Sequence, residues 1–411
     1  MNLPVVAYPT YVTELAEQFQ PVFNQKRQYE QFKRLMSGFV IADKCTIANM
    51  NGLFLYHTNQ SNLNRFVTQS NWNPNKMIEI EIDLINSIEK GGILVIDDYV
   101  VEKYGKEIYG TDWHRDHCKK RSIWGLQIAD CVLTGYGTYS LLSTVYVRKG
   151  SRWCTKGFKK KSEIQLEHIK RLVKLGLKFS CVVMDSWYCS KNLLQQIKRM
   201  KKDWIAQCKS NRLIRSGKRW ISLRDFAERK FAKVPFRVIK IDLDTYFMKA
   251  FTVTMKGMGR VRVLISQNKH GNFNFYMTNR VDWNEVAIAK RYSRRWAIEV
   301  WHREGKGNYG LEDCQLRSDE AVTRYLTLSS LAANLLEIAS LLSPVYATLQ
   351  NRGWTPELKH RWVLAELVSQ LISSASQVQD LDLKQVIESI LCPYTSTLRE
   401  GKVKNMMESD S

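Results

Sequence analysis

Tyr292-Ser-Arg-Arg-Trp-Ala-Ile-Glu-Val-Trp-His-Arg-Glu-Gly-Lys306 carries the side chains from which the rest of the chain can be interpreted. Four of them are separated by three, four and seven residues, namely Tyr292, Arg295, Glu299 and Lys306. On a helix that turns by about 100° per residue, these offsets fall within roughly 60° of one another. The spacing therefore predicts one helix with a narrow stripe of charged and phenolic groups. The tryptophans beside the stripe favour a helix that faces a cleft over an ordinary solvated helix.

Two apolar segments without polar alternation predict buried strands that lead into acidic side chains. The run Ile93–Ile96 follows two glycines and leads into Asp97 and Asp98. The run Phe179–Met184 leads into Asp185. A carboxylate at such a strand end is costly unless it is paired, hydrogen-bonded or bound to metal, and ligand sites form at strand ends in open α/β sheets. Taken alone, Asp185 is more often a turn or helix-capping residue than a ligand.

The spacing Tyr-x2-Arg-x3-Glu-x6-Lys matches the YREK signature without a gap, so the chain resembles DDE transposases of bacterial insertion sequences. The run Val183-Met-Asp-Ser-Trp-Tyr188 also resembles the second-aspartate motif of that family. The resemblance covers roughly residues 90 to 335 in order. It implies an α/β fold with an RNase H-like core, in which helices flank a mixed five-stranded sheet.

The resemblance also implies roles for the acidic residues, because the family has its first Asp on strand one, its second after strand four and its Glu on a later helix. The catalytic and metal-binding set would then be Asp97, Asp185 and Glu299. Asp98 is a further catalytic candidate, since the family usually has Thr or Ser shortly after its first Asp and Tyr99 stands there instead. Strand alternation lets only one of the two neighbouring aspartates face Glu299. We prefer Asp97, which directly follows the apolar run.

In the resembled family, the positions of Tyr292, Arg295 and Lys306 contact DNA near the transposon end. Three carboxylates from separate segments suit two Mg²⁺ ions, for which Mn²⁺ can substitute, because carboxylate oxygens bind such ions and an ion pair can activate the attacking oxygen and stabilise the leaving one. The implied activity is cleavage of DNA at the ends of an insertion sequence and transfer of the freed 3′-OH to target DNA. The implied partners are double-stranded terminal inverted repeats, target DNA and a second copy of the chain in a homodimeric complex.

Two alternatives stay open. One is a catalytically inactive, transposase-derived repressor that only binds DNA. The other is a structure-selective nuclease on the same RNase H-like core. Intact acids and an intact Tyr-Arg-Glu-Lys set favour the active transposase.

The composition is compatible with a polyanionic partner. The chain has 411 residues, with 62 Lys and Arg against 40 Asp and Glu, and a formal net charge of +22. Such a basic excess suits nucleic acid binding. Nine cysteines include no CxxC pair, which disfavours a zinc module or disulfide scaffold and favours a reducing, cytoplasmic location. The start lacks a basic segment with an apolar run, and charged residues interrupt the apolar stretch 321–342, so we expect neither a signal peptide nor a membrane partner.

The pattern of the chain changes along its length. Two short helices around residues 56–59 leave open a DNA-binding helix-turn-helix or a plain helical cap. We expect five segments in all: a helical N-terminal region at 1–88, the first part of the catalytic core at 89–209, a β-rich insertion at 210–270, the remainder of the core with the Glu-bearing helix at 271–345, and a helical C-terminal region with a loose tail at 346–411.

Overall fold

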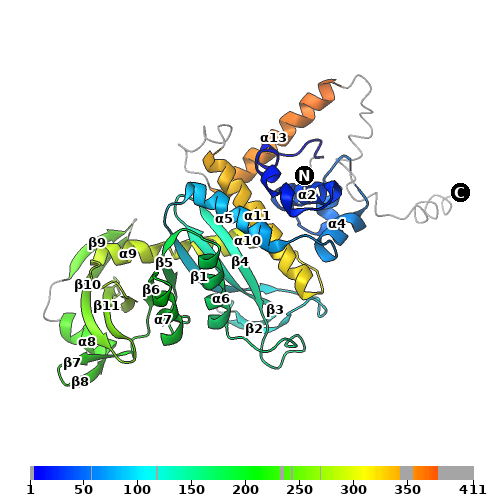
Figure 1. The fold of residues 1–411 in the computed structure, drawn as a ribbon. Coiled ribbons are helices and arrows are strands. Elements are labelled where there is room, and N and C mark those ends of the chain that lie inside the picture. The colour runs from blue at the N-terminus through cyan, green and yellow to red at the C-terminus, as the bar shows by residue number, and fades with distance from the viewer. Residues whose placement is uncertain are drawn as a thin grey trace. The chain divides into compact units, whose positions relative to one another are not determined.

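The computed structural model describes residues 4–56, 58–116, 119–231, 236–241, 244–268, 270–342 and 355–377. The chain divides into two compact units (Figure 1). The first unit comprises Met1–Ile80, Glu107–Tyr109 and Glu304–Ser411, and the second comprises Glu81–Lys106 and Gly110–Arg303. The predicted loose tail at the C-terminus lies outside the described residues.

The first unit is helical and packs around α11 (Asp319–Leu342). By length and composition α11 could cross a membrane, yet 78% of its most apolar window is buried inside the protein. It contacts α1, α2 and α4, so it is the core helix of this unit, as its interrupting charges predict. The other helices of the unit are α1 (Thr10–Leu15), the 3-10 helix η1 (Ala16–Val22), α2 (Lys26–Ile41), α3 (Ile47–Gly52), α4 (Gln60–Thr68), the first part of α5 (Pro74–Ile88) and α13 (Pro356–Gln377).

The two short helices predicted around residues 56–59 are present as α3 and α4, which contact each other. Asn59 caps α4, because its side chain accepts a hydrogen bond from the N–H of Ser61. An asparagine at this position satisfies one of the free N–H groups at a helix start. His57, which lies between the two helices, is outside the described residues.

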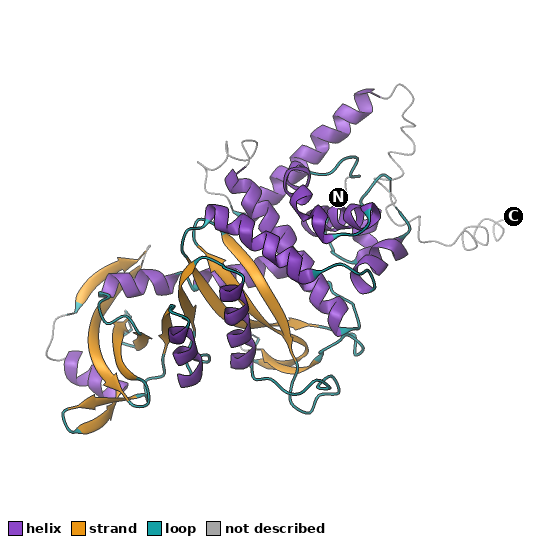
Figure 2. Ribbon diagram, viewed as in Figure 1, coloured by secondary structure: helices purple, strands orange, loops and turns teal. Residues whose placement is uncertain are grey.

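The second unit contains a mixed sheet of twelve strands (Figure 2), so the α/β class is confirmed. Five strands run in the order β4-β3-β1-β5-β6. In this group β3 is antiparallel to β1 and β4, whereas β5 is parallel to β1 and β6. The strands are β1 (Gly92–Glu102), β2 (Asp112–Asp116), β3 (Arg121–Thr134), β4 (Thr138–Tyr146), β5 (Phe179–Met184), β6 (Asp203–Gln207), β7 (Leu213–Ser216), β8 (Arg219–Ser222), β9 (Arg237–Ile241), β10 (Asp244–Met255), β11 (Gly259–Gln267) and β12 (Phe273–Thr278).

The sheet does not end at five strands, because the β-rich segment after β6 extends it. β12 pairs antiparallel with β6, and β11 and β10 continue the ladder beyond β12. A free edge at β6 would leave unpaired backbone groups, and the added strands satisfy them. One apolar cluster joins the two parts, since Val183 and Ile205 of the inner strands pack with Leu264 and Ala250 of the outer ones.

Helices cover the sheet of the second unit (Figure 2). They are α6 (Lys161–Lys174), α7 (Lys191–Arg199), α8 (Leu223–Phe231), α9 (Glu285–Ser293) and α10 (Trp296–Gly307), of which α10 continues into the first unit. α6 packs on β3 and β4, α7 packs on β6, and α9 packs on β6, β10 and β11.

The predicted end of the first strand is wrong. β1 continues to Glu102, so Asp97 and Asp98 lie inside the strand and not after it. Only the parallel pairing with β5 stops at Ile96, whereas the antiparallel pairing with β3 runs on past both aspartates. Asp97 and Asp98 therefore remain in the sheet because the long partner strand β3 pairs with them.

The prediction of one helix from Tyr292 to Lys306 is also wrong. α9 ends at Ser293 and α10 begins at Trp296, with a turn between them. Ile288 of α9 packs in the apolar cluster that joins the inner and outer strands, and Ile298 of α10 is fully buried as well. The four residues of the signature thus do not share one helix face.

Candidate active site

Asp97 and Asp98 are neighbours in β1, and the pleat of a strand turns successive side chains to opposite faces of the sheet. Asp97 is the first residue after the last parallel pair between β1 and β5, which joins Ile96 to Met184. Asp185 directly follows Met184, so Asp97 within β1 and Asp185 after β5 stand at the same level of the sheet. This is the carboxyl edge of the parallel strands, where ligand sites form in α/β sheets.

The half-buried carboxyl group of Asp97 is held in an environment that opposes its charge. Burial raises the pKa of Asp97 to about 7, and the nearby charges of Asp185 and Asp98 add to the rise. The backbone N–H of Asp98 donates to Asp97 Oδ1 at 2.9 Å, and this bond acts in the opposite direction. Burial also raises the pKa of Asp185, although two backbone N–H groups of the following turn donate to it. Paired carboxyls with raised pKa values are typical of functional sites.

Arg295 connects these aspartates to Glu299. It lies in the turn between α9 and α10, where its Nη1 donates to Asp97 Oδ2 at 3.3 Å and its Nη2 donates to Glu299 Oε1. Its positive charge also lowers the pKa of Asp185. The ion pair with Glu299 that the sequence spacing allows is present, and the same guanidinium also pairs with Asp97.

Asp98 has different surroundings on the other face of β1. Lys161, at the start of α6, donates to both of its carboxylate oxygens at 3.0 and 2.9 Å. Gln127 Nε2 and the hydroxyl of Tyr188 donate to it as well. Burial and the charge of Asp98 hold the pKa of Tyr188 well above its usual range, so the phenol keeps its proton and remains a donor. Asp98 thus accepts from a lysine, an amide and a phenol, whereas Asp97 shares the charge of Arg295 with Glu299.

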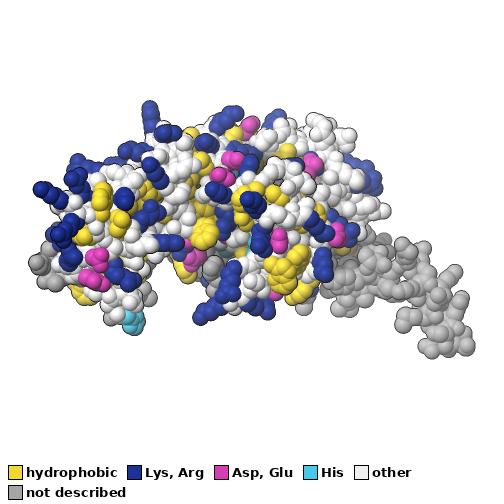
Figure 3. Space-filling model, turned by 90° about the horizontal axis from the view of Figure 1, so that it is seen from below, with side chains coloured by type: hydrophobic (Ala, Val, Ile, Leu, Met, Phe, Trp, Pro, Cys, Tyr) yellow, Lys and Arg dark blue, Asp and Glu magenta, His cyan; other side chains and the backbone are white. Residues whose placement is uncertain are grey.

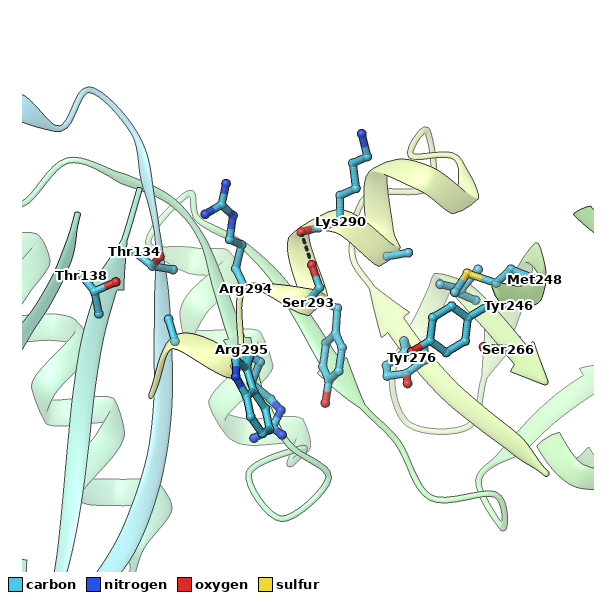
Figure 4. Close-up of a pocket in the computed structure, with 15 residues that line it drawn as sticks. Thr134, Thr138, Tyr246, Met248, Ser266, Tyr276, Lys290, Ser293, Arg294 and Arg295 are labelled. Carbon is cyan, nitrogen blue, oxygen red and sulfur yellow. Dashed lines mark hydrogen bonds between the residues drawn. The ribbon is translucent and has the colours of Figure 1, made fainter. Parts of the chain in front are cut away.

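A groove of about 1160 Å³ opens beside this cluster, and Tyr292 and Arg295 both line it (Figure 4). Lys290, Arg294 and Arg295 bring positive charge to the groove, and the two arginines point in opposite directions from the turn (Figure 4). No acidic residue is among the fifteen described residues of its wall. Its wall therefore suits a ligand with negative charge and stackable rings. The remaining lining residues are Thr134, Thr138, Tyr246, Met248, Leu264, Ser266, Tyr276, Ala289, Ser293, Trp296 and Ala297.

Tyr292 is fixed in that wall by its neighbours. Its ring packs against Tyr276 of β12 with 4.4 Å between centroids, and its hydroxyl donates to Gln207 Oε1 at 3.4 Å. Burial raises the pKa of Tyr292 well above its usual range. Lys306 lies seven residues after Glu299 on α10, in the part of that helix that belongs to the first unit.

Basic side chains dominate the surface shown in Figure 3, where Lys and Arg are more abundant than Asp and Glu. Exposed aromatic rings accompany them in the second unit, and Trp187 and Trp296 are both largely exposed. Trp187 follows Asp185 by two residues and lies 4.8 Å from the ammonium of Lys161. Exposed rings among basic groups are a typical arrangement for nucleic acid contacts.

The comparison with protein families decides the class of the protein. Residues 89–335 match the family model described as the transposase DDE domain. The chain belongs to this family. A curated relative, the probable transposase for insertion sequence element IS701 from Microchaete diplosiphon, is 25% identical over 358 residues, which cover 82% of this chain and 89% of that protein. A cryo-EM structure of a piggyBac transposase synaptic complex with hairpin DNA aligns with a TM-score of 0.44 and 12% identity over 95% of this chain and 81% of that one.

DDE transposases generally use divalent metal ions. As they stand, no three Asp, Glu, His or Cys side chains among the described residues form a metal-binding group. Arg295 pairs with both Asp97 and Glu299, and so provides the positive charge between them. An all-carboxylate set suits hard cations. The pKa of Asp97 is raised mainly by burial, to which the charges of Asp185 and Asp98 add.

Sequence reasoning did not assign the partners of Asp98. Lys161 belongs to the basic run 159–161, which looks like an ordinary solvated surface. One signal was available, since a lysine at the first position of a helix lies at the positive end of the helix dipole and is unfavourable there without an anion. Tyr188 and Gln127 give no comparable signal, because their contacts depend on the sheet register.

Proposed function

We propose that this transposase cleaves DNA at the ends of an insertion sequence and joins the freed 3′-OH to target DNA by metal-dependent phosphoryl transfer. The observation that carries the proposal is the cluster of Asp97, Asp185 and Glu299 around one guanidinium, at the carboxyl edge of the parallel strands. The cluster borders a basic, aromatic groove with room for a DNA strand. The similarity to an insertion-sequence transposase supports the substrate class.

Asp97, Asp185 and Glu299 are the residues that would hold the divalent ions, two Mg²⁺ in our proposal. Divalent ions held there would stabilise the negative charge of the reacting phosphate and help to activate the attacking oxygen. We further propose that the strand group β4-β3-β1-β5-β6 is an RNase H-like core, on the basis of its order and directions. The chain would act as a homodimer on two DNA ends.

The protein's own side chains have two tasks in this proposal. Arg295 compensates the carboxylates when no cation is bound, and it turns to a DNA phosphate when one is. Such an exchange is feasible because guanidinium groups bind phosphate and carboxylate oxygens with the same two-pronged geometry. Lys290, Arg294 and Tyr292 hold the DNA strand along the groove, and Lys306 contacts the DNA backbone.

The test begins with the DNA that flanks the gene, in which inverted repeats define the ends. A labelled duplex that contains one repeat and its flank is incubated with the full chain in Mg²⁺ or EDTA, together with a supercoiled target plasmid. The proposal expects a metal-dependent cut at the repeat boundary and joined product. Binding without any cut identifies the inactive repressor, and cutting that follows DNA structure but never yields joined product identifies the nuclease.

A further inference from the structure

Asp130 of β3 is the most completely buried acid near the proposed site, with 0% of its surface exposed. It lies directly opposite Asp97 in the antiparallel register, so both side chains are on the same face of the sheet. Neither the sequence spacing nor the family resemblance assigned it a role. A fully buried carboxylate is costly unless donors surround it.

The two oxygens of Asp130 serve different parts of the second unit. Oδ1 accepts hydrogen bonds from the sheet, namely from the N–H of Cys131 at 2.9 Å and from the hydroxyls of Ser140 and Ser143 at 3.2 and 3.1 Å. Oδ2 accepts the indole N–H of Trp301, which belongs to α10, at 2.7 Å. One side chain therefore bonds the sheet to the helix that bears Glu299.

A second contact next to this bond fixes the same helix. His302 Nε2 lies 3.6 Å from Asp130 Oδ2, and the His302 ring packs on the ring of Tyr99 with 4.2 Å between centroids. Tyr99 is two residues past Asp97 and hence on the same face of β1. Trp301 and His302 follow Glu299 by two and three residues. Trp301 and His302 thus both hold α10 against the face of the sheet that carries Asp97 and Asp130.

We propose that Asp130 is a positioning residue, which acts through Trp301 and His302 to aim Glu299 at Asp97 and Asp185. This inference rests on the proposed function for its consequence, because correct aim matters only if Glu299 binds metal. The anchoring itself concerns only this chain's own contacts. Groups that orient metal ligands commonly change metal affinity or activity by about 10–100-fold when they are replaced.

The matched substitutions are Asp130→Asn, Trp301→Phe and the double variant, with Glu89→Gln as control. Asp130→Asn keeps the shape of the carboxyl group, and Trp301→Phe keeps an aromatic ring but removes the N–H. If Asp130→Asn does not fold, Trp301→Phe alone still tests the bond. Glu89 is another buried acid of the second unit, which accepts the N–H of Gly137 and so holds the β3–β4 turn.

Two measurements on the full chain without DNA test the proposal. The first is amide hydrogen exchange of peptides from residues 296–303, which should become at least about tenfold faster in Asp130→Asn and Trp301→Phe but not in Glu89→Gln. The second is calorimetric Mn²⁺ affinity, which should weaken by about 10–100-fold in the same two variants. The double variant should show the same exchange rate and the same Mn²⁺ affinity as either single variant, because both substitutions remove the same hydrogen bond.

The positioning role would be overturned if both single variants kept the wild-type rate of amide exchange and the wild-type Mn²⁺ affinity. It would also be overturned if Glu89→Gln changed the exchange rate and the Mn²⁺ affinity as much as Asp130→Asn does, since that would indicate general destabilisation. If the wild-type chain binds no Mn²⁺, the metal site of the proposed function fails, and hydrogen exchange alone then decides whether Asp130 anchors the helix.

Discussion

The two faces of β1 treat two adjacent, chemically identical residues in opposite ways. On one face, Asp98 accepts hydrogen bonds from Lys161, Gln127 and Tyr188. On the other face, Asp97 shares Arg295 with Glu299, and burial raises the pKa of Asp97 to about 7. The first face satisfies its acid with fixed partners, and the second leaves a deficit of positive charge.

This difference shows that two neighbouring residues of one strand can have different roles, one in stability and the other in function. A carboxylate that already has its donors contributes to the fold and has little left to offer a ligand. A carboxylate that lacks them costs folding free energy and binds a cation in return. The predictions below test whether the two faces of β1 are divided in this way.

The largest expected effect concerns cleavage. Asp97→Asn, Asp185→Ala and Glu299→Gln should each lower single-turnover cleavage of a terminal-repeat duplex in Mg²⁺ by on the order of 10³-fold or more, because the ions that stabilise the transition state lose a ligand. DNA affinity should change little, since phosphate contacts supply most of it. The measurement is a gel-based cleavage assay beside a binding titration.

Asp98→Asn is the control for that experiment, and it should keep a measurable cleavage rate. If Asp97→Asn and Asp98→Asn lowered the cleavage rate by nearly equal factors, the proposed difference between the two faces of β1 would be wrong. Near wild-type cleavage in any of the three triad variants would remove that residue from the site.

The second prediction concerns folding stability. Lys161→Met should lower the unfolding free energy by about 3 kcal/mol, because it leaves the largely buried Asp98 without its cation. Asp97→Asn should leave stability unchanged or raise it in metal-free buffer, since it removes repulsion with Asp185. Denaturant titrations in EDTA compare the variants. A more destabilising effect of Asp97→Asn than of Lys161→Met would contradict the comparison.

The third prediction concerns pH. The pKa of Asp97 is raised to about 7 from its ordinary value of 3.8, so the folded chain binds more protons than the unfolded chain between these limits. The unfolding free energy of the metal-free protein should therefore fall as pH rises from about 4 to 7, by up to about 1.4 kcal/mol per pH unit from this group. Asp97→Asn should flatten that slope. If the unfolding free energy depended equally on pH in the variant and in the wild type, a group other than Asp97 would be responsible for the pH dependence.

The smallest expected effect concerns DNA affinity. If Arg295 exchanges its carboxylates for a phosphate, Arg295→Gln should reduce the slope of log affinity against log salt by about 0.9 on terminal-repeat DNA. Arg199, an exposed arginine of α7 outside the groove, provides the control variant Arg199→Gln, which should reduce the slope less. If Arg295 only pairs with acids, its replacement leaves the slope unchanged, and a fluorescence anisotropy titration over several salt concentrations distinguishes the two.

Much of the second unit could be predicted because its signals are local. Uninterrupted apolar runs predict β1 and β5. Strand alternation also predicts that Asp97 and Asp98 face apart, before any contact is known. Membership of the transposase DDE family is likewise anticipated by short motifs, because these depend on residue type and spacing alone.

The features that could not be predicted depend on distant contacts. The break between α9 and α10 has no local signal, because the sequence 292–306 is helical throughout in its periodicity. Arg295 of the turn contacts Asp97 of β1, which is distant in the sequence. The continuation of β1 past Asp98 depends on β3, which is long enough to pair with it. Asp130 carries no sequence signal, since its donors come from three segments that meet only in the fold.

The continuity of the sheet from β3 through β6 to β10 determines how this protein can be engineered. A chain trimmed between β6 and β12 would retain β12 beside β6 but lose β11, its other neighbour. The bare edge would carry Phe273, Phe275 and Tyr276, a set of side chains that invites pairing with strands of other molecules. The segment 210–270 thus cannot be deleted without harm to the fold. A shortened protein would aggregate before its DNA binding could be measured. Changes to the DNA binding of this protein therefore have to be made by surface substitutions that leave every strand in place.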